Sequence, residues 1–514
     1  MRKAAISKGA RHQVSRTMSV AAPISGWNAR DPYAAMKPTD AVILKNFFCL
    51  PSELMVRKGF SSHATGMTGT IETLAKYDPP SGSAKMFAAV GTAIYNATSA
   101  GAVGAAESLP YSVTNARWQH CNFTTSGGNF LVMCNGVDGV LEYNGTTWSD
   151  PAITGVTKAN LVNVNAFKNR LFFVEKDTLK AWYLPTSSIS GAASALDFGS
   201  IFTQGGYLMA MATWSLDAGY GLDDHAVFIT SAGEVAIYKG TDPSDSTKWA
   251  LVGVFNVGSP LGRRCFEKYA GDVVVICKDG LLPLSKGLMS SRVNTKSALT
   301  EKIQSVISAA TTDYASNFGW QVTLYPPQNM LVINVPISST ISEQYVMNTI
   351  SGAWSQFTGM NAASWEFFNE ELYFGGDGVV YKAWDGTSDN GSNIDWQCLQ
   401  AFNFFGSASQ LKRFVMARPI VAFNTQPGLL SGINVDFDIT APIGQPTYTT
   451  YTTYTWDSGI WDASTWAGDL TINRSWQSVY GVGYSAAIHL KGASNNHDIR
   501  FYSTDYVFET GGVV

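Results

Sequence analysis

Histidines and cysteines are the side chains of this sequence best suited to hold a metal ion or to form a nucleophile with its base, and there are six of each. Neither set has the spacing that such chemistry needs. No histidine stands in an H-E-x-x-H frame, and no two cysteines form a C-x-x-C pair. The residues concerned are His12, His63, His120, His225, His489 and His497, with Cys49, Cys121, Cys134, Cys265, Cys277 and Cys398.

Phosphate-binding and hydrolase motifs are also missing from the sequence. There is no G-x-x-x-x-G-K-[ST] loop, no G-x-S-x-G elbow and no G-x-G-x-x-G between a strand and a helix. The stretch Gly375–Gly378 (GGDG) has the context of a hairpin turn. We therefore predict no catalytic residue, no cofactor and no metal ligand, and expect that the protein is not an enzyme.

Carboxylates leave one alternative open. Two acids from distant parts of a chain can form a glycosidase pair, and sequence spacing would not reveal them. The segment Tyr143–Trp148 (YNGTTW) contains the G-x-T-W half of the box found in sialidase-like propellers, but it lacks the Ser and the Asp. No particular pair of acids stands out.

Composition limits the classes of partner. The net charge is −4 and only 14% of the residues are charged, so the chain is not built to hold nucleic acid by bulk electrostatics. No apolar run approaches the ~20 residues of a membrane-spanning helix, and we expect no stable membrane insertion. The scattered cysteines predict reduced, mostly buried thiols, with a Cys265–Cys277 disulfide as the less favoured alternative.

The positioning elements are predicted to be strands. Seven segments repeat one pattern, a short apolar strand, a Gly, Asn or Asp turn, and a second strand that ends in an aromatic residue. Their starts are spaced by roughly 40–60 residues, as expected for the blades of a β-propeller. The segments are Lys85–Asn96, Asn129–Trp148, Asn169–Tyr183, His225–Lys239, Asp272–Lys286, Met330–Phe357 and Glu371–Trp384.

One hairpin cannot bury both of its faces, whereas neighbouring hairpins stacked around an axis can. We therefore predict a mainly β protein with a propeller of about six to seven blades over residues 71–390. The aromatic strand ends should pack between blades. One short amphipathic helix is predicted over Ser297–Ala310, with Ser297 as its N-cap and Leu299, Ile303, Val306, Ile307 and Ala310 on one face.

The propeller spacing stops near Gly391, and residues 391–514 are predicted to form a β-sandwich-like platform domain. Its last strands, Gly483–Leu490 and Ile499–Phe508, are expected to pair as a long hairpin across a turn at residues 494–497. Within the domain, Trp456, Trp461 and Trp466 recur every five residues in the Trp-rich loop 446–466. A protruding loop and a packed aromatic corner are both compatible with this spacing, and a ligand-binding platform is a third alternative.

The N-terminal residues 1–23 form a basic arm, with Arg2, Lys3, Lys8, Arg11 and Arg16 and no acid before residue 18. The segment lacks the apolar region of a secretory signal. A tail without fixed structure, a start codon placed upstream of Met18, and an arm that becomes ordered on a neighbouring subunit are the three interpretations.

Residues 24–70 carry a more specific pattern. Ile24–Phe60 contains a Gly followed by N-x-R, an M-x-P-x-D-A turn, an L-x-N strand and an R-x-G with an aromatic residue after it. This order resembles the opening of the tail nozzle (tail hub, tail tubular B-like) proteins of short-tailed bacteriophages. The matching positions are Gly26, Asn28, Arg30, Met36, Pro38, Asp40, Ala41, Leu44, Asn46, Arg57, Gly59 and Phe60.

The resemblance implies a virion protein that is assembled in the bacterial cytoplasm. It implies a ring, usually of six copies, below the head-to-tail adaptor, with tail fibres or spikes outside and DNA passing through its channel. The segment 24–70 is then expected to join the platform, which would form the channel, and the basic arm would face the adaptor. A mildly acidic conduit suits this task because cationic contacts would grip the DNA. The alternative is a receptor- or carbohydrate-binding propeller protein of the tail, possibly one that degrades glycans.

Overall fold

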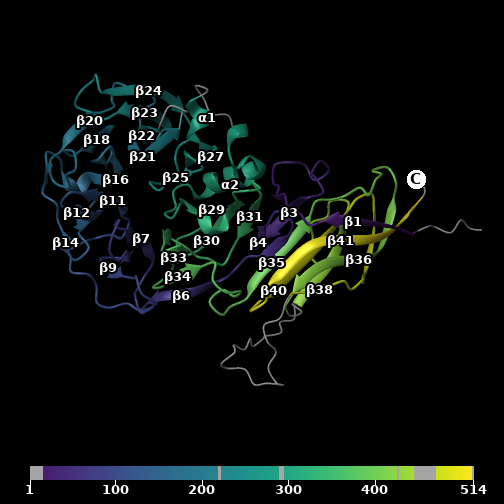
Figure 1. The fold of residues 1–514 in the computed structure, drawn as a ribbon. Helices are drawn as coiled ribbons and strands as arrows, with labels where there is room; N and C mark the ends of the chain where they lie inside the picture. The colour runs from purple at the N-terminus through teal and green to yellow at the C-terminus, as the bar shows by residue number, and fades with distance from the viewer. Residues whose placement is uncertain (1–14, 218–221, 289–294, 425–427, 445–469, 512–514) are drawn as a thin grey trace, which may run out of the picture. The chain divides into compact units, whose positions relative to one another are not determined.

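The computed structural model describes residues 15–217, 222–288, 295–424, 428–444 and 470–511, and these residues form a mainly β protein. The chain divides into two compact units (Figure 1). Unit 1 contains residues 1–57 and 393–514, and unit 2 contains Lys58–Ser392. No helix among the described residues is long and apolar enough to cross a membrane.

Unit 2 consists of small antiparallel sheets that follow one another along the chain, seven in its described part. The first four are β7 (Ile71–Tyr77), β8 (Lys85–Val90) and β9 (Ala93–Asn96); β11 (Gln119–Thr125), β12 (Gly128–Cys134), β13 (Val140–Tyr143) and β14 (Trp148–Ser149); β16 (Leu161–Phe167), β17 (Arg170–Glu175), β18 (Lys180–Tyr183) and β20 (Ser194–Asp197); and β21 (Leu208–Asp217), β22 (Leu222–Thr230), β23 (Glu234–Gly240) and β24 (Trp249–Asn256). Two short strands, β15 (Ile153–Thr154) and β19 (Gly191–Ala192), pair separately.

The remaining sheets complete the series. The fifth contains β25 (Phe266–Tyr269), β26 (Asp272–Cys277) and β27 (Gly280–Pro283), and the sixth contains β28 (Gln321–Tyr325), β29 (Met330–Pro336), β30 (Ser342–Asn348) and β31 (Trp354–Phe357). The seventh contains β32 (Ser364–Phe368), β33 (Glu371–Gly375) and β34 (Val380–Ala383), to which β6 (Phe60–Thr65) and β10 (Gly101–Ala102) add two strands from the start of the unit.

The seven sheets close a ring. Contacts run from β7 to β11, β16 and β21, then through β26 and β25 to β28 and β32, and from β32 back to β7. Figure 1 shows β7, β11 and β16 near the centre of unit 2, with β9, β14, β20 and β24 towards its rim. The first strand of each sheet therefore faces the axis, and the arrangement is that of a β-propeller.

The predicted hairpins coincide with the outer strands of these sheets. Each of the seven segments supplies at least two paired strands of one sheet; His225–Lys239, for example, contains most of β22 and all but the last residue of β23, joined at Gly233. The aromatic strand ends pack between sheets, as predicted. Trp148 of the second sheet lies edge-on against Phe87 of the first, with ring centroids 4.9 Å apart.

The predicted helix is shorter than expected and starts later. The α-helix α2 runs over Gln304–Tyr314, and Ser297 ends a separate 3-10 turn. Ile303, Ile307 and Ala310 are buried, whereas Leu299 and Val306 are only half-buried. Thr300 is one reason for the interruption, because its Oγ1 accepts a hydrogen bond from the backbone N–H of Leu281. The other helical segments are α1 (Leu284–Leu288) and the 3-10 turns η1 (Lys158–Asn160), η2 (Thr295–Ser297), η3 (Glu301–Ile303) and η4 (Pro326–Gln328).

Unit 1 is built from the two ends of the chain. One group of strands, the outer sheet, runs in the order β38 (Thr471–Asn473), β36 (Lys412–Phe423), β41 (Ile499–Thr510), β5 (Leu54–Val56) and β4 (Phe47–Cys49), with β39 (Gln477–Gly483) on β36 and β1 (Ser15–Ala21) on β41. A second group contains β2 (Gly26–Trp27), β3 (Asp40–Lys45), β35 (Ile394–Gln400), β40 (Ala486–Ser494) and β37 (Gly428–Val435).

The last two long strands of unit 1 do not form the expected hairpin. β40 pairs with β35 and β37, whereas β41 pairs with β36, β1 and β5. The turn passes the chain from one sheet to the other, with Asn496 at φ 63° and His497 buried. The two strands meet face to face, because the backbone N–H of Ile488 donates to Tyr506 Oη at 3.1 Å.

The segment 24–70 also divides differently from the expectation. Residues up to Arg57 belong to unit 1, whereas β6 pairs with β34 in the seventh sheet of unit 2. The packing of Phe60 explains this, since its ring lies 5.1 Å from Phe374 and 5.0 Å from Tyr381. The propeller-like unit therefore starts at Lys58 instead of residue 71, and it ends at Ser392.

Candidate functional site: the axis of the propeller-like unit

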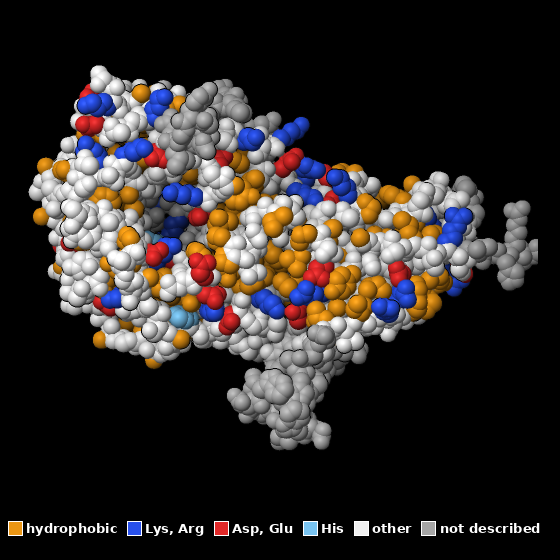
Figure 2. Space-filling view, viewed as in Figure 1, with side chains coloured by type: hydrophobic (Ala, Val, Ile, Leu, Met, Phe, Trp, Pro, Cys, Tyr) orange, Lys and Arg blue, Asp and Glu red, His pale blue; other side chains and the backbone are white. Residues whose placement is uncertain are grey.

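A group of ionisable side chains lies at the axis of unit 2, around a cavity of about 270 Å³ that we call the axial cleft. Figure 2 shows a hollow at the centre of this unit, with charged side chains in and around it. The first strands of the sheets point their polar residues into this space. The lining includes Gln119, His120, Asn163, Asn165, Arg263, Arg264, Glu267 and Gln321.

Glu366 of β32 is bound by Lys76 and His120, two side chains from other sheets. Its Oε1 lies 3.4 Å from Lys76 Nζ of β7, and its Oε2 lies 3.3 Å from His120 Nε2 of β11. Burial opposes ionisation of this carboxyl group, but the hydrogen bond and charge of His120, with Lys76, outweigh it and lower the pKa of Glu366. Glu366 is therefore an ionised acid that joins three sheets.

The pKa of Glu267 in β25 is shifted in the opposite direction. Burial, together with the negative charge of Glu366, raises the pKa of Glu267 to about 8. At neutral pH this carboxyl group is therefore largely protonated and can donate a hydrogen bond. Glu267 and Glu366 are thus neighbouring acids whose pKa values are shifted in opposite directions, although only Glu267 lines the cleft.

Arg264 fixes one wall of the cleft. Its Nη2 donates to Thr73 Oγ1 at 2.7 Å, to the Glu72 carbonyl oxygen at 2.8 Å and to the Trp118 carbonyl oxygen at 3.2 Å. Its guanidinium carbon lies 5.4 Å from the centroid of the Phe318 ring. Burial lowers the pKa of Arg264 to about 10, so the side chain stays charged at neutral pH.

The polar groups of the axial cleft are thus largely used by the protein itself. Asn165 donates to the Met211 carbonyl oxygen, and Gln321 donates to the Trp365 carbonyl oxygen. Arg263 and Arg264 line the cleft, and the ionised Glu366 lies close to Glu267, so charges of both signs surround this space. The geometry is that of a charged network that ties the first strands of the sheets together.

The residues of the N-terminal motif are brought together in two buried polar clusters of unit 1. In the first, Asn28 Nδ2 donates to Asp40 Oδ2 at 2.8 Å and to Asp31 Oδ2 at 2.9 Å. Asn28 Oδ1 accepts the backbone N–H groups of Arg30 and Asp31. Gly26 has φ 84° at the turn that enters β2, beside Asp40 in the parallel register with β3.

In the second cluster, Arg57 Nε donates to Asn46 Oδ1 at 2.9 Å, and Asn46 Nδ2 donates to the Asp395 carbonyl oxygen at 2.6 Å. Asn46 and Arg57 are almost fully buried, and Asn46 has the left-handed φ of 57°. Asparagine tolerates this conformation better than most residues. Both clusters hold the backbone, and neither leads into a described cavity.

The other motif residues lie apart. Pro38 takes part through its carbonyl oxygen, which accepts a hydrogen bond from Gln400 Nε2 at 3.2 Å. Gly59 belongs to unit 2, where a Cβ atom would lie 1.8 Å from the Ser388 carbonyl oxygen, so only glycine fits there. Arg30 is paired with Asp31 at 2.7 Å and is largely exposed.

Several predicted site residues fall outside the described part of the chain. These are Arg2, Lys3, Lys8 and Arg11 of the basic arm and Trp456, Trp461 and Trp466 of the Trp-rich loop. Arg16 is described, and it lies exposed in β1, opposite Phe508 of β41. The arm is therefore part of the chain's own outer sheet from Ser15 onwards.

The axial residues were not singled out from the sequence. Lys76, His120 and Glu366 come from three sheets, so no spacing along the chain connects them. Two features of the sequence could have pointed to these residues. One is the polar residues within the first strands of the sheets, and the other is the Arg263–Arg264 pair before β25. All six cysteines are free thiols, five of them buried, which confirms the reduced state that was predicted and excludes the Cys265–Cys277 disulfide.

No group of three or more His, Cys, Asp or Glu side chains that could hold a metal ion occurs among the described residues. No protein-family model matches the chain, and no curated protein matches it. Solved structures do match. They include the computationally designed Ika8 protein (12% identity, 63% of this chain and 100% of that one, TM-score 0.37) and BBS1N in complex with ARL6DN (11%, 65% and 99%, 0.38).

A further match is YCF48 bound to D1 peptide, with 11% identity over 63% of this chain and 94% of that chain and a TM-score of 0.30. Scores this low support no argument about function. The β-propeller arrangement described above therefore depends on the sheet order and the closed ring of contacts in the chain itself.

Proposed function

We propose that this chain is a structural virion protein that forms the tail nozzle ring of a short-tailed bacteriophage. In this proposal a ring of six copies, the number usual in that family, lies below the head-to-tail adaptor, and tail fibres or spikes attach to it. The platform formed by unit 1 is β-sandwich-like and lines the conduit for DNA. The resemblance of Ile24–Phe60 suggests the family, and the structural roles of Asn28, Asp40, Asn46 and Arg57 are compatible with it.

The observation that carries the proposal is the exposed face of the outer sheet of unit 1. Five large apolar side chains lie exposed on β36, β38, β39 and the turn before β39, and Tyr480 among them is 80% exposed. The others are Met416, Ile472, Trp476 and Val482. Figure 2 shows hydrophobic side chains gathered over the strands of unit 1. Exposed apolar surface of this kind marks protein–protein contacts.

One ion pair lies on this face, beside the exposed Trp476. Arg418 binds Asp505 at 2.6 Å, and its guanidinium carbon lies 4.6 Å from the Trp476 ring centroid. With Arg418 neutralised by Asp505, the apolar side chains around it favour contact with another apolar surface. In a ring of copies, that surface belongs to the neighbouring subunit.

The test is the assembly state of the full chain, measured by light scattering after size exclusion and by negative-stain microscopy. We expect rings, and we expect Tyr480→Glu to shift them to smaller species by placing a charge in the subunit contact. Ile350→Glu is the matched control, because Ile350 is an exposed apolar residue of unit 2. A stable monomer at micromolar concentration would refute the ring and favour the receptor- or carbohydrate-binding alternative.

A further inference from the structure

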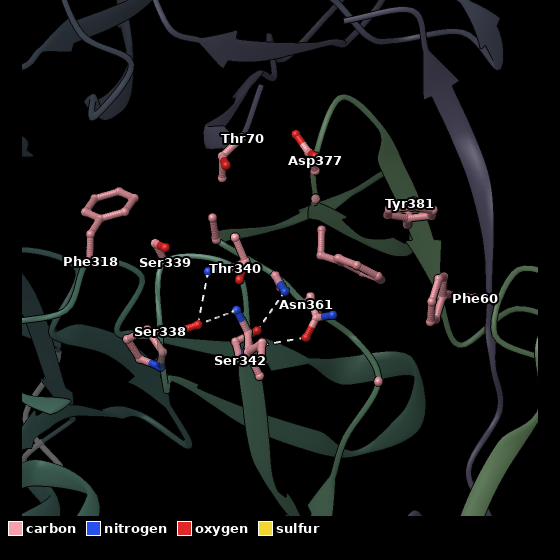
Figure 3. A pocket seen from close by; sticks show the side chains of 17 residues that line it. Phe60, Thr70, Phe318, Ser338, Ser339, Thr340, Ser342, Asn361, Asp377 and Tyr381 are labelled. Atoms are coloured by element: carbon pink, nitrogen blue, oxygen red, sulfur yellow. Dashed lines mark hydrogen bonds between the residues drawn. The ribbon is translucent and has the colours of Figure 1, made fainter. Parts of the chain in front are cut away.

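A second cavity of unit 2, which we call the lateral pocket, has a volume of about 320 Å³ and lies between the sixth and seventh sheets (Figure 3). One wall is aromatic, with Phe60 of β6 and Tyr381 of β34. The facing side is polar, with the loop of residues 338–342 between β29 and β30, and with Asn361. Thr70 and Asp377 lie together at one end of the pocket in Figure 3.

Several polar side chains of this pocket make no hydrogen bond within the described part of the protein. Within the described residues, the carboxylate of Asp377, the hydroxyl of Tyr381 and the hydroxyls of Thr70 and Thr340 make no hydrogen bond. Asn361 uses only its Oδ1, which accepts the backbone N–H of Ser342 at 3.3 Å, so its amide donors remain available. Acceptors, donors and hydroxyls therefore face one space without partners.

The walls of the lateral pocket are nevertheless held in place. Ser338 Oγ accepts the backbone N–H groups of Thr340 and Ile341 at 3.3 and 3.1 Å, which fixes the polar loop. On the aromatic side, Tyr381 is stacked on Phe374 with centroids 5.1 Å apart. The site is therefore preformed, and ligand binding would cost little conformational entropy of the protein.

The composition of the lining selects the chemistry of the ligand. It contains no Lys, Arg or His, and its one ionisable acid is Asp377. A phosphate, sulfate or carboxylate group would find no cation there and would be repelled by Asp377. Aromatic faces suit the C–H faces of a sugar ring, while hydroxyl, amide and carboxylate groups suit its hydroxyls. The volume is within the range of small-molecule sites.

We propose that the lateral pocket is a binding site for a neutral saccharide, with Asp377 and Asn361 hydrogen-bonded to sugar hydroxyls and the Tyr381 side of the pocket against a ring face. The inference goes beyond the tail-ring proposal and is independent of it, because every lining residue belongs to unit 2. It assigns no hydrolysis, since Asp377 is the only acid in the lining.

The full chain would be screened on a glycan array that carries neutral, sialylated and sulfated oligosaccharides, and the best neutral oligosaccharide would then be titrated by calorimetry. We expect binding to neutral glycans only. Asp377→Asn and Asn361→Ala should each weaken the affinity about tenfold or more, a change of about 1.4 kcal/mol. Asp313→Asn is the matched control, because Asp313 is exposed outside the pocket.

Spermidine would be titrated separately, since a carboxylate beside aromatic rings could also accept an organic cation. The proposal is overturned if the array shows no neutral glycan, if acidic glycans or spermidine bind in its place, or if Asp377→Asn binds as tightly as the wild type. Thermal unfolding of each variant shows whether a loss of binding reflects a loss of fold. The assembly state is measured on the same samples, so that a failure of glycan binding can be distinguished from a failure to form the ring.

Discussion

The axial cleft and the lateral pocket are cavities of similar size in the same unit, at about 270 and 320 Å³, but they differ in how their polar atoms are used. At the axial cleft, Arg264 in the lining and Glu366 beside it are engaged by groups from several sheets. In the lateral pocket, Asp377 has no such partner among the described residues. The cavity with more charge is therefore the structural one, and the cavity with fewer charged groups is the one prepared for a ligand.

Arg264→Met should cause the largest loss of stability, because it removes a side chain of the hydrogen-bonded network at the axial cleft. The substitution keeps much of the side-chain volume but removes the charged donor from three oxygen atoms, of which Thr73 Oγ1 and the Trp118 carbonyl oxygen keep other donors. Since a hydrogen bond to a charged group contributes about 1.5–3 kcal/mol, we expect the free energy of unfolding to fall by about 2 kcal/mol. Urea unfolding measures this.

The matched variant for Arg264 is Lys278→Met, which also removes a cation from unit 2 but at an exposed position. It should change the free energy of unfolding by less than about 0.5 kcal/mol. If both variants lost the same free energy of unfolding, the hydrogen bonds of Arg264 would contribute nothing beyond the effect of removing one positive charge.

An intermediate effect is expected for Glu267→Gln, and it should depend on pH. Burial raises the pKa of Glu267 from its ordinary value of 4.5 to about 8. Between these values the folded chain holds the proton more tightly than the unfolded chain does, so stability falls as the pH rises towards 8 and falls no further above it. Glu267→Gln removes this contribution, and its unfolding free energy should decline less between pH 5 and pH 8, by about 1 kcal/mol or more.

Urea unfolding at a series of pH values would compare Glu267→Gln with the wild type and with Glu107→Gln, which lies outside the axial cleft. Parallel pH profiles for all three proteins would contradict the buried, protonated state of Glu267.

The smallest effect on stability is expected for Asp377→Asn, which tests the ligand side of the comparison. Because the carboxylate makes no hydrogen bond within the described residues, its replacement should change the free energy of unfolding by less than about 0.5 kcal/mol. Chemical denaturation without any ligand present provides this value. A loss above about 1 kcal/mol would mean that Asp377 supports the fold, and the contrast between the two cavities would disappear.

The repeated sheets were predictable because their outer strands carry the period-two pattern locally. In β22 and β23, Val227, Ile229, Val235 and Ile237 alternate around a glycine turn, and this pattern needs no distant partner. The first strands were not predicted as a set. Polar residues such as Lys76 and Glu366 interrupt their apolar pattern, because these strands face the axis instead of a continuous core.

Pairing in unit 1 was harder to predict for a related reason. The sequence pattern identifies β40 and β41 as strands, but it does not state which neighbour each one takes. Their partners β35 and β36 are separated from them by about a hundred residues or fewer, while β1 and β5 come from the opposite end of the chain. The motif residues Asn28, Asp40, Asn46 and Arg57 were identified by resemblance, and only the structure connects them to hydrogen bonds.

The seventh sheet has a mechanical consequence for unit 2. The chain enters and leaves this unit through neighbouring residues, since the backbone N–H of Phe60 donates to the Ser388 carbonyl oxygen and that of Asn390 donates to the Phe60 carbonyl oxygen. A pulling force transmitted along the polypeptide would therefore act on β6 and the segment after β34, and the other six sheets would lie outside its path. The ring of sheets can in this way stay unstretched while the rest of the chain is under tension.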